Sequence, residues 1–197
     1  MLEQVFTKPD TNRSSVALFA RNFFRYPAML GSIVPSSRFL VKDILSRIDW
    51  NRARVVVEFG PGVGTITREM LRRMRGDAVL IVIELNEEFV EYLRDTFLDP
   101  RLRIVNGSAV DVRRILAEQG IDAADYVISG LPYSLLSESL RREIVAESRL
   151  ALRPSGSLLV FQFNRKLLPY LKSSFQSVQQ NLQLLNILPA LIFDCRP

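Results

Sequence analysis

The sequence predicts an α/β fold, built on a seven-stranded, mostly parallel sheet with helices on both faces. Three observations predict it. Five short apolar runs alternate with longer amphipathic runs, the apolar runs lack a polar alternation, and two more apolar runs close together end the chain. With 197 residues, 48% of them hydrophobic, the chain is long enough for one such domain with a sizeable core.

The expected strands are short runs rich in Val, Ile and Leu. They are Arg54–Phe59, Val79–Glu84, Leu102–Val105, Tyr126–Ser129 and Ser157–Phe163. The expected helices lie between them, at Thr65–Met74, Glu87–Phe97, Val110–Gln119 and Glu138–Leu152. Strands that are apolar throughout indicate a parallel sheet covered on both faces. The runs Leu182–Leu188 and Ala190–Cys195 are split only by Pro189, so we expect an antiparallel pair at the sheet edge.

The first part of the chain, residues 1–50, is expected to be an N-terminal helical extension of the main domain, residues 51–197. Its expected helices are Arg13–Tyr26 and Val41–Ile48. On the first, one face carries Val16, Phe19, Ala20, Phe23 and Phe24, and Arg21 and Arg25 lie toward another. Such a helix can lie in an anionic membrane interface. The alternative is an ordinary helix packed on its own domain.

Composition excludes several kinds of site. The chain has no histidine, which rules out His-based triads, His-ligated zinc and imidazole acid/base catalysis. The one cysteine, Cys195, is expected to be a small apolar residue in a late strand, in a reducing compartment. The net charge of +5 favours anionic partners. No signal peptide is evident, and Val79–Ile83 is far shorter than the ~20 residues of a membrane span.

The stretch VVVEFGPGVGTITREM, residues 55–70, carries the clearest ligand signal. Gly60, Gly62 and Gly64 follow the first strand at every second position, two residues after Glu58. Glycines there let a ligand approach the backbone and free N–H groups at a helix start. An acid at this turn would repel a pyrophosphate but suits an ammonium group, such as the methionine end of S-adenosylmethionine. The alternative is a tight strand-to-helix turn with no ligand.

Two further loops fit the same ligand. Glu84 closes the second strand, where a carboxylate can accept both ribose hydroxyls; a solvated acid at a strand end is the alternative. The small residues Asn106-Gly107-Ser108-Ala109 follow the third strand. They are suited to line an adenine slot, with Ser108 available for hydrogen bonding, unless they form a plain turn.

These motifs resemble those of class I S-adenosylmethionine-dependent methyltransferases, over about residues 50–197. The resemblance implies S-adenosylmethionine as the cofactor and a set of residues that contact it. That set is Ser36, Ser37, Glu58, Gly60, Pro61, Gly62, Gly64, Glu84, Leu85, Ser108, Ala109, Ser129 and Gly130. The family often has Asp where Ser108 stands.

The loop after the fourth strand, Ser129-Gly130-Leu131-Pro132-Tyr133, resembles the Asn-Leu-Pro-Tyr loop of rRNA adenine dimethyltransferases, with Gly130 in place of Asn. Together with the stretch GSIVPSS, residues 31–37, it looks like bacterial phospholipid and ornithine-lipid N-methyltransferases. The resemblance implies that Leu131, Pro132 and Tyr133 form the catalytic loop and that Ser36 and Ser37 contact or cover the cofactor. A Pro-Ser-Ser helix cap is the other interpretation of Ser36 and Ser37.

The predicted function is therefore methylation of a membrane aminolipid amine by in-line displacement, without a metal. Tyr133 is expected to position the amine. Arg165, Lys166 and Tyr170 are candidates to bind a headgroup phosphate or carboxylate, unless they form a solvated basic turn. The expected location is cytoplasmic, on the inner face of the membrane. The rival enzyme is an rRNA or nucleic-acid adenine N6-methyltransferase, and a non-catalytic scaffold is the third possibility.

Overall fold

A computed structural model describes residues 37–185 and 189–197, which form one seven-stranded sheet in the order β3-β2-β1-β4-β5-β7-β6. The parallel strands are β1 (Val55–Phe59), β2 (Val79–Glu84), β3 (Leu102–Asn106), β4 (Ala124–Ser129) and β5 (Leu152–Gln162). The chain starts in the middle of the sheet, moves out to β3, and then crosses back to β4 beside β1. The carboxyl ends of β1 and β4 therefore lie side by side, which is where open α/β sheets bind ligands.

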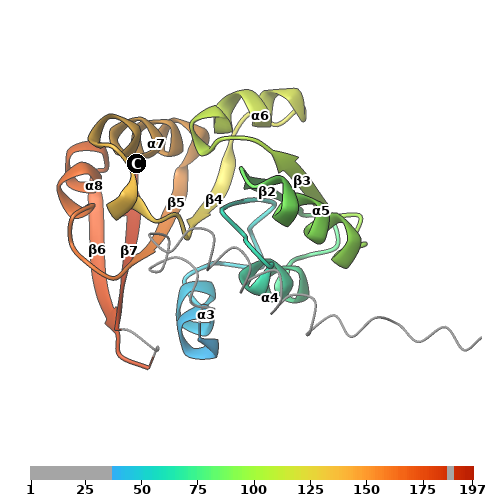
Figure 1. Cartoon of the computed structure of the whole chain (residues 1–197), viewed down its shortest axis with the longest axis horizontal. Helices are drawn as coiled ribbons and strands as arrows, with labels where there is room; N and C mark the ends of the chain where they lie inside the picture. Colours follow the sequence, from blue (N-terminus) through green and yellow to red (C-terminus); the bar gives the residue numbers. More distant parts are fainter. Residues whose placement is uncertain (1–36, 186–188) are drawn as a thin grey trace, which may run out of the picture.

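Helices cover both faces of the sheet (Figure 1). On one face lie α3 (Arg38–Leu45), α4 (Thr65–Arg73) and α5 (Glu87–Thr96), and on the other lie α6 (Val112–Glu118), α7 (Glu138–Ala151) and α8 (Leu168–Ser174). Alternate residues of β1 serve the two cores: Val56 packs with α3 and α4, and Val57 packs with α6 and α7. Two short 3-10 helices, η2 (Ala109–Asp111) and η3 (Tyr133–Leu135), follow β3 and β4.

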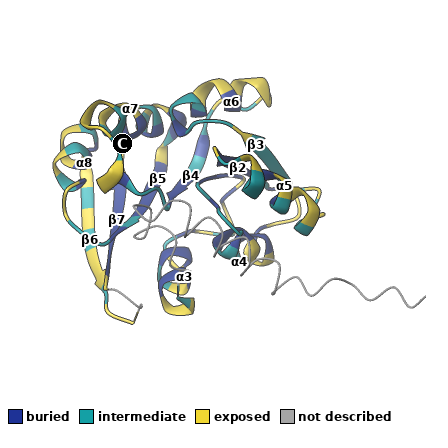
Figure 2. Cartoon of the chain, viewed as in Figure 1, coloured by how far each residue is buried: buried dark blue, intermediate teal, exposed yellow. Residues whose placement is uncertain are grey.

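The last two strands, β6 (Ser177–Gln183) and β7 (Ala190–Arg196), are antiparallel, as expected. β7 lies between β5 and β6 and is buried along nearly its whole length, whereas β6 is mostly exposed (Figure 2). Cys195 lies in β7 and is buried, as predicted. The predicted position of β6 was wrong: Leu182–Leu188 was expected, whereas the strand runs from Ser177 to Gln183. This strand is polar because neither of its faces is buried, so it shows no apolar run in the sequence.

Two helices also differ from expectation. α3 begins and ends three residues before the expected Val41–Ile48, because Ser37 caps it: its Oγ accepts a hydrogen bond from the N–H of Leu40 at 3.2 Å. α8 was not expected at all, since it is short and begins with Pro169 in its first turn. The expected helix Arg13–Tyr26 lies outside the described residues.

Candidate active site

The turn from β1 into α4 has a glycine backbone conformation that leaves room for a ligand. Gly60, Gly62 and Gly64 have φ of 66°, 55° and 76°, a region that side chains rarely allow. A Cβ on Gly64 would lie 2.6 Å from the Phe97 ring, so packing also requires glycine there. A Cβ on Gly62 would have nothing within 4 Å. The backbone at Gly62 therefore borders open space, where a ligand can approach.

Glu58 lies beneath this turn and is buried. Its Oε2 accepts a hydrogen bond from the Thr67 hydroxyl at 2.5 Å. Burial raises the pKa of Glu58 to about 8, because desolvation outweighs the hydrogen bond from Thr67, and the charge of Glu84 adds to the rise. A cation placed beside this acid would favour its ionised form.

The Glu84 side chain, at the end of β2, links the glycine turn after β1 to the residues that follow β2. Its Oε2 accepts from the N–H of Gly62 at 3.2 Å and its Oε1 from the N–H of Asn86 at 3.0 Å. Burial raises the pKa of this carboxyl, and the N–H donors partly offset the rise. The Asn106 side chain in turn donates to the carbonyl oxygens of Glu84 and Leu85, at 3.0 and 3.2 Å. These bonds fix the ends of β2 and β3 relative to the glycine turn.

The rim beside Glu84 suits a flat apolar ligand. Leu85, the residue after the buried Glu84, is 74% exposed and so leaves an apolar side chain open to contact. Ala109 is buried in the adjacent 3-10 helix η2, and Ser108 immediately precedes it, half-buried. Pro61 is buried and its carbonyl oxygen accepts from the N–H of Gly64 at 2.9 Å.

The loop after β4 packs against the glycine turn. The N–H of Gly130 donates to the carbonyl oxygen of Phe59 at 3.3 Å, and a Cβ on Gly60 would lie 3.0 Å from Leu131 Cδ2. The Leu131 carbonyl oxygen accepts from the N–H of Tyr133 and from the Gln162 side chain, both at 2.9 Å. Pro132 is half-buried. The loop expected to hold the acceptor thus contacts the loop expected to hold the cofactor.

Tyr133 points into the core rather than into open space. It is 1% exposed, and its hydroxyl lies 3.1 Å from the Ser129 hydroxyl, within hydrogen-bonding distance. Burial strongly raises the pKa of the Tyr133 phenol, so it stays protonated at neutral pH. In this arrangement Tyr133 can support the loop, but it cannot accept a proton from an amine.

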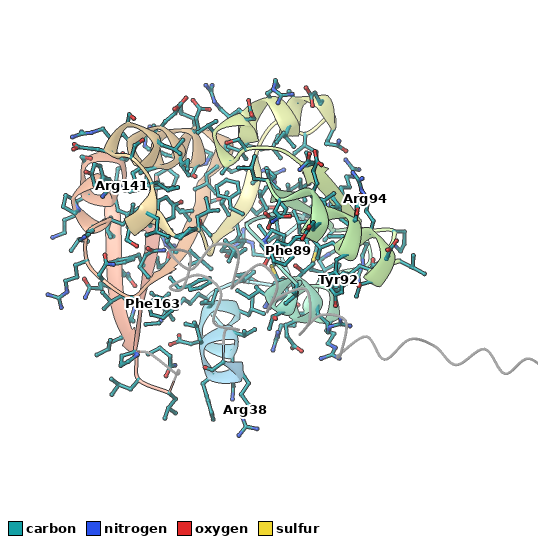
Figure 3. The ribbon with its side chains drawn as sticks, viewed as in Figure 1. Arg38, Phe89, Tyr92, Arg94, Arg141 and Phe163 are labelled. Atoms are coloured by element: carbon teal, nitrogen blue, oxygen red, sulfur yellow. The ribbon has the colours of Figure 1, made fainter. Side chains whose placement is uncertain are left out.

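Basic side chains gather beside the end of β5. Arg165 and Lys166 are exposed, and neither forms an ion pair with another described residue. Tyr170, on α8, lies under the guanidinium groups of Arg141 and Arg142, at 5.5 and 5.1 Å from its ring centre. Figure 3 shows Arg141 on the α7 and α8 side of the sheet and Phe163 near α3.

Ser37 is the residue that precedes α3, and its hydroxyl contacts α3 and the segment after β6. The Ser37 hydroxyl caps α3 and donates to the Leu185 carbonyl oxygen at 2.8 Å, which supports the helix-cap interpretation. Ser36 lies outside the described residues.

The sequence analysis gave no role to four residues that contact the candidate site, namely Thr67, Arg141, Phe161 and Gln162, and it placed Asn106 in the loop after the third strand without its hydrogen bonds to Glu84 and Leu85. Thr67 and Asn106 had a partial signal, because both are polar residues within the motifs themselves. The others act through contacts between distant parts of the chain. Within residues 37–185 and 189–197, no group of three or more Cys, Asp or Glu side chains is arranged to hold a metal, and no helix there is long and apolar enough to cross a membrane.

Comparison with known proteins identifies the family. A model of the ribosomal RNA adenine dimethylase family matches residues 30–196. The ornithine lipid N-methyltransferase of Singulisphaera acidiphila is 36% identical over 141 residues, which cover 71% of this chain and 73% of that protein. Ribosomal RNA small subunit methyltransferase A of Mycoplasma capricolum is 35% identical over 105 residues, 51% of this chain. That match spans only 37% of the Mycoplasma protein.

The fold also matches solved structures. The precorrin-6y C5,15-methyltransferase of Geobacter metallireducens superposes with a TM-score of 0.64 at 15% identity, covering 80% of this chain and 87% of that one. Identity at this level shows the fold alone, and it confirms the Rossmann-like methyltransferase sheet predicted from the sequence.

Proposed function

Because the chain belongs to the ribosomal RNA adenine dimethylase family of S-adenosylmethionine-dependent N-methyltransferases, we propose that it methylates the amine of a membrane aminolipid, of the phosphatidylethanolamine or ornithine-lipid type. The observation that carries this proposal is the relative from Singulisphaera acidiphila, an ornithine lipid N-methyltransferase by name. It aligns over most of both chains, whereas the rRNA relative from Mycoplasma aligns over 37% of its own length.

The residues present fit the cofactor. The open backbone at Gly62 would contact the amino-acid end of the cofactor, and the buried acid Glu58 would face its positive charge. The exposed side chain of Leu85 would contact the flat adenine base. Glu84 is well placed for the ribose, at the end of β2. When bound, S-adenosylmethionine supplies a methyl group on a positively charged sulphur.

The contribution of the chain to catalysis is mainly positioning. The Leu131 carbonyl oxygen already accepts two hydrogen bonds, and Ser129 is paired with β1 and β5 in the sheet, so the Gly130 carbonyl is the better candidate to orient the amine. Since the Tyr133 phenol stays protonated, we assign the proton lost by the ammonium headgroup to water. Tyr133 then acts as a positioning residue, by holding Ser129 and the loop.

A cluster of exposed leucines supports approach to a membrane. Leu182, Leu184 and Leu185 are 57%, 65% and 62% exposed. They lie where β6 ends, and Gln183 pairs with Ala190 beside the carboxyl end of β5. The leucines therefore project from the same edge of the sheet as the glycine turn. Such a surface fits an enzyme that draws its substrate from a bilayer.

The basic side chains just before α8, Arg165 and Lys166, support the proposal that the substrate has an anionic headgroup. Arg165 and Lys166 carry positive charge just after β5, and neither forms an ion pair with an acid among the described residues, whereas Arg141 acts on Glu138 as well as on the Tyr170 ring. A headgroup phosphate or carboxylate would neutralise this charge.

The second candidate is methylation of adenine in rRNA, which the family match and the net charge of +5 favour. One experiment separates the two. The protein is incubated with methyl-labelled S-adenosylmethionine and, in separate tubes, phosphatidylethanolamine vesicles, ornithine-lipid vesicles and small-subunit rRNA. We expect label in a lipid and none in RNA. Label in RNA alone would overturn the proposal. Gly62→Val, which fills the space at the glycine turn, is the inactive control.

A further inference from the structure

The backbone conformation of Gly130 does not require a glycine, but the packing around it does. Among the described residues, positive φ occurs only at Gly60, Gly62, Gly64 and Gly120. Position 130 is therefore open to other residues as far as the backbone is concerned. A Cβ there, however, would lie 2.7 Å from Cζ and 3.2 Å from Cε1 of Phe161. The Phe161 ring already fills the space into which a side chain at position 130 would project.

Phe161 is held in that place by the sheet. It lies in β5, opposite Ile192 of β7, and packs with Phe163 against the core on the α3 and α4 side. The next residue, Gln162, points to the other face and donates its amide N–H to the Leu131 carbonyl oxygen at 2.9 Å. Two consecutive residues of β5 thus fix the loop after β4 from opposite faces of the sheet.

We propose that Phe161 is a specificity-determining residue: its ring keeps position 130 free of any side chain, so that the acceptor pocket meets the amine with an aromatic wall and backbone carbonyls. This inference rests on the function proposed above. Without a side-chain amide at position 130, the pocket has nothing there to hold a planar base by its edge. It suits an amine on a flexible aliphatic chain, whose charge after methylation an aromatic ring tolerates well.

The test is a double-mutant cycle of Gly130→Asn and Phe161→Ala, measured as kcat/KM for vesicles of the aminolipid that the wild type methylates. Gly130→Asn alone is expected to lower kcat/KM by about tenfold or more, since the amide must displace the ring. In the Phe161→Ala background the same change is expected to cost less than about threefold. Equal costs in both backgrounds would overturn the proposal.

Selectivity is the second readout. Methyl transfer to rRNA is expected to become detectable in the double variant and to stay undetectable in Phe161→Ala, and a double variant that leaves rRNA unmodified would contradict a role in specificity. Gly76→Asn is the matched control, because a Cβ at Gly76 meets nothing within 4 Å. Thermal unfolding of each variant shows whether it folds. If wild-type label entered RNA alone, the proposed function would fail, and the cycle, run on RNA, would still show whether positions 130 and 161 are coupled.

Discussion

The carboxylate of Glu84 accepts a hydrogen bond from the backbone N–H of Gly62, with 3.2 Å between Oε2 and nitrogen. This bond links the end of β2 to the middle of the glycine turn after β1. The two motifs, twenty-two residues apart in the chain, are therefore in direct contact. A change in either is expected to affect the cofactor site as a whole.

Glu84→Gln is expected to weaken S-adenosylmethionine binding by about tenfold or more, equivalent to about 1.4 kcal/mol. The amide has one acceptor where the carboxylate has two, and its NH₂ would face a backbone N–H of Gly62 or Asn86. Titration calorimetry measures the loss. Glu91→Gln, an exposed acid on α5, is the control and should bind normally. Normal binding by Glu84→Gln would show that this carboxylate does not organise the site.

Binding of S-adenosylmethionine near pH 7 is expected to release protons, up to about one per molecule bound. Because the pKa of Glu58 is raised to about 8, the acid is mostly protonated before binding, and a cationic ligand favours its ionised form. Calorimetry in buffers of different ionisation enthalpy counts the protons. Glu58→Gln should remove the release. A release that persists in Glu58→Gln would assign the proton to another group.

The same shift predicts how stability varies with pH. In the folded protein Glu58 titrates at about 8, above its ordinary value of 4.5, so the folded state binds its proton more tightly. Its contribution to the free energy of unfolding is therefore full below about pH 4.5 and is lost as pH rises through about 8. Urea unfolding at a series of pH values should show wild type losing stability relative to Glu58→Gln over this window. Parallel curves would contradict the shift.

Tyr133→Phe is expected to lower the free energy of unfolding by about 1 kcal/mol, through loss of the contact with Ser129, and to leave the pH dependence of kcat unchanged. The phenol is buried and protonated, so it is not the proton acceptor. Chemical denaturation and a pH-rate profile measure the two effects. A change in the shape of the pH-rate profile would instead make Tyr133 part of proton transfer.

Leu184→Asp with Leu185→Asp is expected to reduce co-sedimentation with anionic aminolipid vesicles severalfold, since it places charge on the exposed end of β6. The control is Leu150→Asp, a leucine that is 52% exposed at the end of α7. Equal sedimentation of the wild type, the double variant and Leu150→Asp would show that this leucine cluster does not bind the membrane.

Most of the sheet was predictable from the sequence because its strands are buried on both faces. β1, β2, β3 and α5 match the predicted ranges to within one residue, whereas β4 begins two residues and β5 five residues before the predicted start. The glycine turn after β1 and the acid at the end of β2 were also predictable, since both are local features of the sequence. β6 was not predictable, because a polar edge strand such as SVQQNLQ carries no apolar signal.

The contacts around the loop after β4 could not be predicted from the sequence. Gly130 and Phe161 are thirty-one residues apart, and only the pairing of β4 with β5 brings them together. The burial of Tyr133 was likewise hidden, because a tyrosine in a loop is usually taken to reach a ligand. The contacts of these residues depend on which strands are neighbours in the sheet, and strand order is a property of the whole fold.

The most direct measurement of the central claim is a competition in one tube. Wild-type protein, methyl-labelled S-adenosylmethionine, aminolipid vesicles and small-subunit rRNA are mixed, and the lipid is extracted and analysed by mass spectrometry beside the nucleosides of the RNA. We expect headgroup amines that carry one or more added methyl groups, and unmodified adenine in the RNA. Dimethyladenine in the RNA with unaltered lipid would contradict it.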